Sequence, residues 1–178
     1  AHDLISYLSI LFIYLLAKEM FNRKIAFWAT IVYAISPSFL FLKFSHKMDV
    51  PVVLFMTAAV YFFYSFKRTG KPINIYLFWA SCFLGFMVKA VYAFYPVIFI
   101  PLAVYISGDR ETLNKLKNSL SHHIAAIAVM LVLVSPWFAM QYLTHGKSFL
   151  RYQYVEFVGR FLAKSGDIGS RDNNFWQY

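Results

Sequence analysis

The sequence predicts an all-α fold: a polytopic transmembrane helix bundle of about six spans with an extracytoplasmic amphipathic interfacial helix. The chain is 60% hydrophobic and only 14% charged, whereas a soluble domain carries about a quarter charged residues. Its apolar residues gather in blocks, and a membrane-spanning helix needs a block of roughly 20. Its basic residues form small clusters between the blocks, as in loops beside lipid head groups. The net charge of +9 therefore does not indicate a nucleic-acid partner.

Six apolar segments are the predicted spans: Leu4–Ala17, Ile25–Leu42, Val50–Phe66, Ile73–Val88, Ala90–Ile106 and Leu120–Leu143. Between the fourth and the fifth, Lys89 is the only charged residue. A single helix over residues 73–106 would be about 51 Å long, far more than the roughly 30 Å of a hydrocarbon core. We therefore predict a tight helical hairpin that turns at Lys89.

The last part of the chain is predicted to lie beside the membrane. From Lys147 to Lys164, apolar and aromatic residues recur near helical spacing with Lys, Arg and Gln between them, which is typical of a helix in the interface. The polar stretch SGDIGSRDNN that follows indicates a loop. We divide the chain into a transmembrane region, 1–143, and a juxtamembrane segment, 144–178, leading into a further span. Since no Met begins the chain, we expect it to be a fragment of a longer protein.

Loop charges predict the orientation. Nine basic residues lie in the loops after the first, third and fifth spans: Lys18, Arg23, Lys24, Lys67, Arg68, Lys71, Arg110, Lys115 and Lys117. The loops on the other side hold only Lys43, Lys47 and Lys89. The positive-inside rule puts the first set in the cytoplasm. Asp49, Lys89 and the juxtamembrane segment then share the extracytoplasmic face of a cell or plasma membrane.

Several common sites are not indicated. The single cysteine, Cys82, excludes a disulfide within the chain. There is no P-loop, no G-x-G-x-x-G and no G-x-S-x-G motif. The five histidines show no zinc-ligand spacing with Cys or with one another, so no metal ligands are predicted.

Asp49 and Lys89 each have two interpretations. Asp49, two residues before Pro51, suits a helix N-cap, or it is an acid at the mouth of an extracytoplasmic cavity that orients a basic group or binds a cation. Lys89 is either a lysine that snorkels to the head groups or a cation that neutralises a phosphate, because charges at the membrane boundary are functional candidates. Gly85, one turn earlier, would permit close helix packing.

Glu156 and Arg160 also have two interpretations. They stand four residues apart on the predicted interfacial helix, so they share a face and can pair with each other. Alternatively, Arg160 turns towards the cavity, where its planar guanidinium suits a phosphate.

Four stretches, in order, carry a family resemblance: FNRKIAFWATIVYAISPSFLFLKFSHKMDVP, GFMVKAVYAFYP, VSPWFAMQYLTHGKSFLRYQYVEFVGRF and NNFW. Together they resemble the polytopic GT-C glycosyltransferases of the protein O-mannosyltransferase and aminoarabinose (lipid A) transferase superfamily. The resemblance implies a polyprenyl-phosphate sugar donor and an active face on the lumenal or periplasmic side. It also implies that Asp49, Lys89 and Arg160 line the cavity that receives the lipid phosphate.

The chain departs from the family pattern at several positions. Phe157 and the Arg171–Asp172 region stand where the compared transferase has His, and Ala90 stands where Gly is common. A metal site built with such a His is therefore not supported. The acidic residues of the family's first extracytoplasmic loop would precede Ala1. We accordingly expect the general base upstream of this chain and no transfer by the fragment alone.

The resulting hypothesis is transfer of a sugar from a polyprenyl-phosphate donor to an acceptor lipid, protein or glycan. Lys89 and Arg160 would bind the donor phosphate, and Asp49 and Glu156 would orient them or bind a cation. The cofactor stays open, with a divalent cation as one option. The alternatives are a transporter or flippase, for which broken helices in symmetric halves would speak, and a structural membrane subunit without chemistry.

Overall fold

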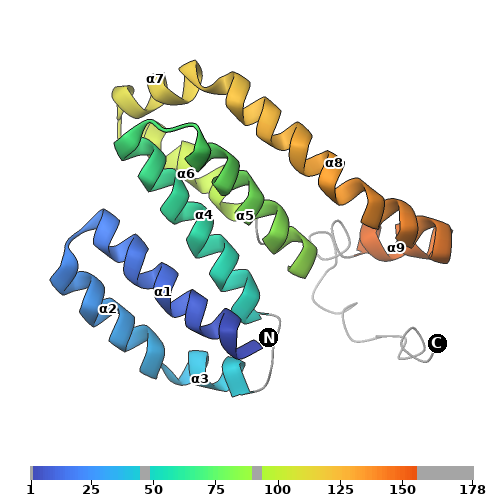
Figure 1. Cartoon of the computed structure of the whole chain (residues 1–178), viewed down its shortest axis with the longest axis horizontal. Coiled ribbons are helices and arrows are strands. Elements are labelled where there is room, and N and C mark those ends of the chain that lie inside the picture. The colour runs from blue at the N-terminus through green and yellow to red at the C-terminus, as the bar shows by residue number, and fades with distance from the viewer. Residues whose placement is uncertain (1, 45–48, 90–93, 156–178) are drawn as a thin grey trace. The chain divides into compact units, whose positions relative to one another are not determined.

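The computed structural model describes residues 2–44, 49–89 and 94–155, and every element in these ranges is a helix (Figure 1). The helices are α1 (His2–Met20), α2 (Arg23–Ile35), α3 (Pro37–Phe44), α4 (Asp49–Thr69), α5 (Ile73–Lys89), α6 (Tyr95–Ile106), α7 (Arg110–Asn118), α8 (Leu120–His145) and α9 (Lys147–Tyr154). The all-α prediction is confirmed.

The chain divides into two compact units, residues 1–134 and 135–178, which are described separately. The boundary falls within α8. The predicted division into 1–143 and 144–178, which concerns membrane insertion, stays a prediction.

Local signals account for the helix ends. Asn22 precedes α2, and its side-chain oxygen accepts a hydrogen bond from the Ile25 N–H at 3.0 Å, as an N-cap does. Asp109 caps α7 in the same way, accepting from the Thr112 N–H at 3.0 Å. Just after the C-terminus of α4, Gly70 takes a φ of +65°, a conformation that glycine adopts without steric cost when it ends a helix.

The predicted span Ile25–Leu42 is a single segment in sequence but two helices in the structure. α2 and α3 meet at an angle of 53° at Ser36. Pro37 disfavours the helical conformation of the residue before it, and Ser36 accordingly takes a ψ of 133°. The Ser36 hydroxyl donates to the Tyr33 carbonyl at 2.9 Å. The predicted span Ile25–Leu42 is therefore bent at this proline, and it stays a prediction as one span.

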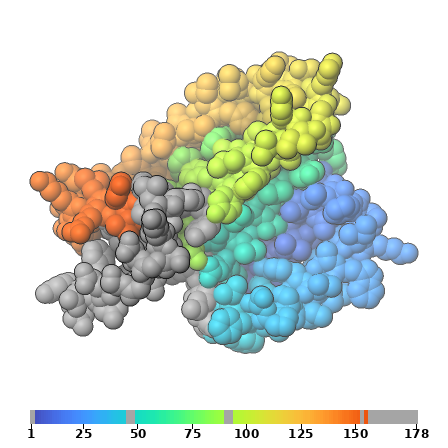
Figure 2. Space-filling view, turned by 180° about the vertical axis from the view of Figure 1, so that it is seen from behind, coloured from blue at the N-terminus to red at the C-terminus, as the bar shows by residue number. Residues whose placement is uncertain are grey.

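α4 lies between α1 and α5 in the first unit, and α2 packs on α1 (Figure 1). Small side chains on α4, Ala58 and Ala59, are buried, and in membranes such residues let helices approach closely. Figure 2, which shows the molecule from behind, has α6 in front of α4. Val104 of α6 joins Ala59 and Cys82 in one buried cluster, so α6 covers α4 and α5 on this face.

The start of α8 is fastened to α5 within the first unit. Trp79 donates its indole N–H to Nδ1 of His123 at 3.0 Å, and the Tyr76 hydroxyl lies 3.4 Å from Nδ1 of His122. Ala126 is completely buried beside Ile75. The two histidines therefore join helices.

Two of the described helices, α4 and α8, are long and apolar enough to cross a membrane, and the bent pair α2–α3 makes a third if counted as one span. α5 and α6 are shorter apolar helices. The count of six spans stays a prediction. In α4, 56% of the apolar window is buried, against 6% in α8.

The second unit is described up to residue 155. Trp137 and Phe138, near the end of α8, contact the ring of Phe149 on α9 with centroids 6.0 and 5.9 Å apart. Gly146, with a φ of +55°, makes the turn between the two helices. α9 confirms the beginning of the helix predicted from Lys147. The rest of that segment lies outside the described residues.

Candidate functional site

Asp49 and Lys89, predicted to face the same side of the membrane, form an ion pair. The Lys89 ammonium donates to Oδ1 of Asp49. The two residues are 40 positions apart in sequence. The apolar run around Lys89 contains no acidic residue that could pair with it, so the partner comes from another helix.

The pair forms because α4 begins where α5 ends. Asp49 is the first residue of α4, and Lys89 is the last of α5. The positive end of the α4 dipole favours a carboxylate in this first turn. Asp49 thus lies in the first turn of α4 and contacts Lys89, while its predicted roles as an N-cap and as a site acid both stay predictions.

The chain reverses after Lys89, as the predicted hairpin requires. Phe94, the next described residue, contacts the rings of Phe83 and Phe86 with centroids 5.7 and 5.4 Å apart. α6 therefore begins beside the last turn of α5. Gly85, one turn before Lys89, is buried, and the close packing predicted for it stays a prediction.

The pair is accessible. The Lys89 side chain is 37% exposed and that of Asp49 is 39% exposed. An ammonium is a compact charge with three N–H donors that can be directed at an anion. At the end of an apolar hairpin, such a group can bind a phosphate, while the neighbouring carboxylate limits its positions.

Lys43, on the predicted extracytoplasmic side, has different surroundings. Its ammonium lies 4.8 Å from the ring centroid of Tyr7, on α1, as in a cation–π contact. Lys43 is therefore engaged by an aromatic ring, whereas Lys89 is engaged by a carboxylate.

The other candidate residues belong to segments that the structure does not describe. Arg160 and Glu156 lie outside the described residues, as do Lys47, Ala90, Phe157 and the Arg171–Asp172 region. The structure brings Asp49 and Lys89 together. The roles predicted for all four candidates stay predictions.

Metal ligands are sparse in the described part of the chain. Within residues 2–44, 49–89 and 94–155, no group of three or more His, Cys, Asp or Glu side chains could hold a metal ion. A divalent cation beside Asp49 would have to compete with the Lys89 ammonium, and it stays a prediction.

At the other end of α4, the structure joins the three predicted cytoplasmic loops in a way that sequence reasoning missed. We call this the basic end, comprising residues 18–24, 67–71 and 109–117. Arg68 of α4 pairs with Glu19 of α1, Lys67 pairs with Asp109 at 2.7 Å, and Lys115 pairs with Glu111 at 2.7 Å. The signal was present in sequence, since the first and third of these loops contain acidic residues among the basic ones.

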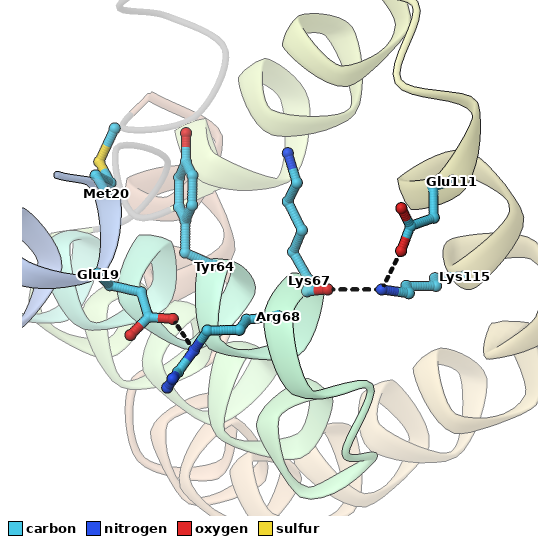
Figure 3. Close-up of a pocket in the computed structure, with 7 residues that line it drawn as sticks. All are labelled: Glu19, Met20, Tyr64, Lys67, Arg68, Glu111 and Lys115. Carbon is cyan, nitrogen blue, oxygen red and sulfur yellow. Dashed lines mark hydrogen bonds and ion pairs between the residues drawn. The ribbon is translucent and has the colours of Figure 1, made fainter.

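The basic end surrounds a pocket of about 330 Å³, shown in Figure 3. Arg68 reaches towards Glu19, and Lys115 reaches from α7 to Glu111 and to the Lys67 carbonyl oxygen, 2.9 Å away.

Asp109, beside this pocket, is strongly held in its charged form. The hydrogen bond from the Lys67 ammonium, followed by those from the N–H and hydroxyl of Thr112, holds the pKa of the Asp109 carboxyl well below its usual range. This loop therefore keeps its negative charge at any physiological pH.

Comparison with known proteins gives one match. The sequence profile of the family described as dolichyl-phosphate-mannose-protein mannosyltransferase matches residues 2–140, which is more than half of the chain. Neither the curated proteins nor the solved structures include a match. The matched range contains both Asp49 and Lys89.

Proposed function

This chain belongs to the dolichyl-phosphate-mannose-protein mannosyltransferase family, whose members are membrane glycosyltransferases of the GT-C type. We propose that it binds the phosphate of a polyprenyl-phosphate sugar at Lys89 during transfer of the sugar to an acceptor. The observation that carries the proposal is the ion pair of Lys89 with Asp49, where α4 begins and α5 ends. The family match covers this pair.

Lys89 acts on the leaving group. When the bond between sugar and phosphate breaks, negative charge develops on the phosphate. A cation already in position stabilises that charge more in the transition state than in the bound donor, which is the condition for a faster reaction. The ammonium at the hairpin end would lie within reach of the donor phosphate, because helix ends at a membrane boundary lie at the depth of lipid phosphates.

Asp49 acts through Lys89 as a positioning residue. A lysine side chain at a helix end can adopt many rotamers and snorkel into the head groups. The Asp49 carboxylate, itself favoured by the α4 dipole, holds the ammonium over the start of α4. Orientation of this kind lowers the entropy cost of reaching the reactive geometry.

Further parts of the site are proposals of the same kind. Arg160 would add a planar guanidinium for the phosphate, and Glu156 would orient it. The general base for the acceptor would come from a segment outside this chain. The exposed apolar surfaces of the helices would hold the isoprenoid tail, and the site would face the extracytoplasmic side.

The transporter alternative has less support. A transporter would be expected to have broken helices in each of two symmetric halves. Among the described residues one bent pair occurs, α2–α3, and its bend follows from Pro37. The family match adds nothing in favour of a transporter.

The test measures transfer by the complete protein with dolichyl-phosphate mannose as the first donor. Lys89→Ala should lower kcat/KM by about 100-fold or more, the usual size for loss of one group that stabilises developing charge. Lys43→Ala is the matched control, because it removes a lysine from the same side of the bundle that contacts Tyr7 instead. Activity of Lys89→Ala within twofold of Lys43→Ala would make Lys89 a snorkelling residue and refute the proposal.

A further inference from the structure

The pocket at the basic end is remote from the proposed donor site. Asp49 begins α4, while Lys67 and Arg68 lie in its last turn. The 21 residues of α4 span about 30 Å at 1.5 Å per residue, which equals the thickness of a hydrocarbon core. A ligand of this pocket would therefore meet the opposite membrane surface from a ligand of Lys89.

The basic end carries more cations than its carboxylates can pair. Three acidic residues, Glu19, Asp109 and Glu111, pair with Arg68, Lys67 and Lys115. For six further cations the described ranges contain no carboxylate partner: Lys18, Arg23, Lys24, Lys71, Arg110 and Lys117. The surplus positive charge favours an anionic ligand over a neutral or zwitterionic one.

The pocket has both polar and apolar lining residues. Its volume of about 330 Å³ lies within the usual range of small-ligand pockets, about 300–1,000 Å³. Lys67, Arg68 and Lys115 line it together with Met20 and Tyr64 (Figure 3). A tyrosine at the end of a membrane helix is typical of the head-group level. Cations beside such a wall fit a phosphate that is attached to an apolar group.

The two carboxylates that line the pocket differ in availability. The Glu19 side chain is only 12% exposed and is held against Arg68. The Glu111 side chain is 78% exposed, although it pairs with Lys115 at 2.7 Å. Exposed pairs of this kind contribute little and are readily exchanged. The Lys115 ammonium can therefore pass from Glu111 to an incoming phosphate while its bond to the Lys67 carbonyl stays in place.

From these observations we propose that the pocket binds the phosphate of an anionic phospholipid head group, with Lys115 as the donor and Glu111 as the competing carboxylate. The proposal does not depend on the sugar-transfer function, because it concerns other residues at the other end of α4. The occupant is a membrane lipid, since the pocket opens at the ends of apolar helices in a membrane protein.

The test measures binding of short-chain phosphatidylglycerol to the complete protein in a neutral detergent. At about 0.3 M salt the Debye length is roughly 5–6 Å, which suppresses the diffuse attraction of the surplus cations. Glu111→Gln should tighten binding about fivefold, because the Lys115 ammonium no longer has to break an ion pair before it binds the phosphate. Asp3→Asn is its control. Asp3→Asn makes the same charge change in an exposed side chain in the first turn of α1, far from the pocket at the end of that helix. It should change the dissociation constant by less than about twofold.

A second pair of variants tests the donor. Lys115→Gln should weaken binding about tenfold, as expected for a lost charge-assisted hydrogen bond. Lys117→Gln removes the same charge from an exposed position on the same helix and should have little effect. If Lys115→Gln does not fold, because its bond to the Lys67 carbonyl is lost, Glu111→Gln still decides.

Three outcomes would overturn the proposal. Equal losses for Lys115→Gln and Lys117→Gln would show diffuse attraction without a site. An unchanged dissociation constant for Glu111→Gln would remove the competition that the structure indicates. Binding of inorganic phosphate as tight as that of phosphatidylglycerol would identify a free anion, and not a lipid, as the ligand. A failure here leaves the Lys89 assay unaffected, so the two proposals fail separately.

Discussion

Asp49→Asn provides the sharpest test of how the Asp49–Lys89 pair works. The substitution keeps the size of the side chain and removes its charge. A polyprenyl phosphate must compete with the Asp49 carboxylate for the Lys89 ammonium, and it also meets a like charge. Removing that charge should therefore tighten binding of the phosphate, while transfer slows because the ammonium is no longer held in position. Tighter phosphate binding together with a lower kcat would distinguish a positioning role of Asp49 from a structural one.

The magnitude follows from exposure. The two side chains are 37% and 39% exposed, so solvent screens their interaction and the pair is worth about 1 kcal/mol or less. Asp49→Asn should accordingly tighten polyprenyl-phosphate binding by no more than about fivefold. The midpoint of thermal unfolding should move little for the same reason.

The assay is a double-mutant cycle with polyprenyl phosphate as the ligand. Asp49→Asn is measured alone and in the Lys89→Ala background, and Asp3→Asn controls for the change in net charge because Asp3 lies in the first turn of α1. If Asp49 acts through Lys89, the tightening should be clearly smaller in the double variant, where only the repulsion between the Asp49 carboxylate and the phosphate is removed. The same tightening in both backgrounds would refute the reasoning, and so would weaker binding by Asp49→Asn alone.

Two further predictions concern orientation and pH. A membrane-impermeant maleimide should label Lys89→Cys from outside intact cells and Lys71→Cys only after permeabilisation. The native Cys82 is buried and should give little background labelling. Labelling of both variants from one side would overturn the predicted topology. Because the pKa of Asp109 is held below its ordinary value of 3.8, its contribution to stability is fully present above about pH 4 and is lost only as the pH falls through the lowered value. Amide exchange in α7, corrected for intrinsic rates, should therefore show unchanged protection between pH 8 and pH 5, and a loss of protection near pH 6 would contradict the assigned contacts.

Residue spacing predicted the helices well because helix formation is local. An apolar block of membrane length, a break at Lys89 required by helix rise, and an amphipathic pattern after Lys147 each depend on neighbours within a few turns. The break at Ser36 was missed although its cause is local too, because Pro37 stands within an otherwise apolar block and hydropathy alone does not register it.

The candidate site was only partly predictable. The sequence by itself determined that Asp49 and Lys89 lie at helix ends on one side of the bundle, since loop charge and span length depend on composition alone. Their contact was decided by the tertiary structure, because α4 and α5 pack side by side and bring together residues 40 positions apart. The same holds at the basic end. Positive charge there is plain from the sequence, but only the packing of α1, α4 and α7 decides which carboxylate pairs with which cation and which of these side chains line the pocket.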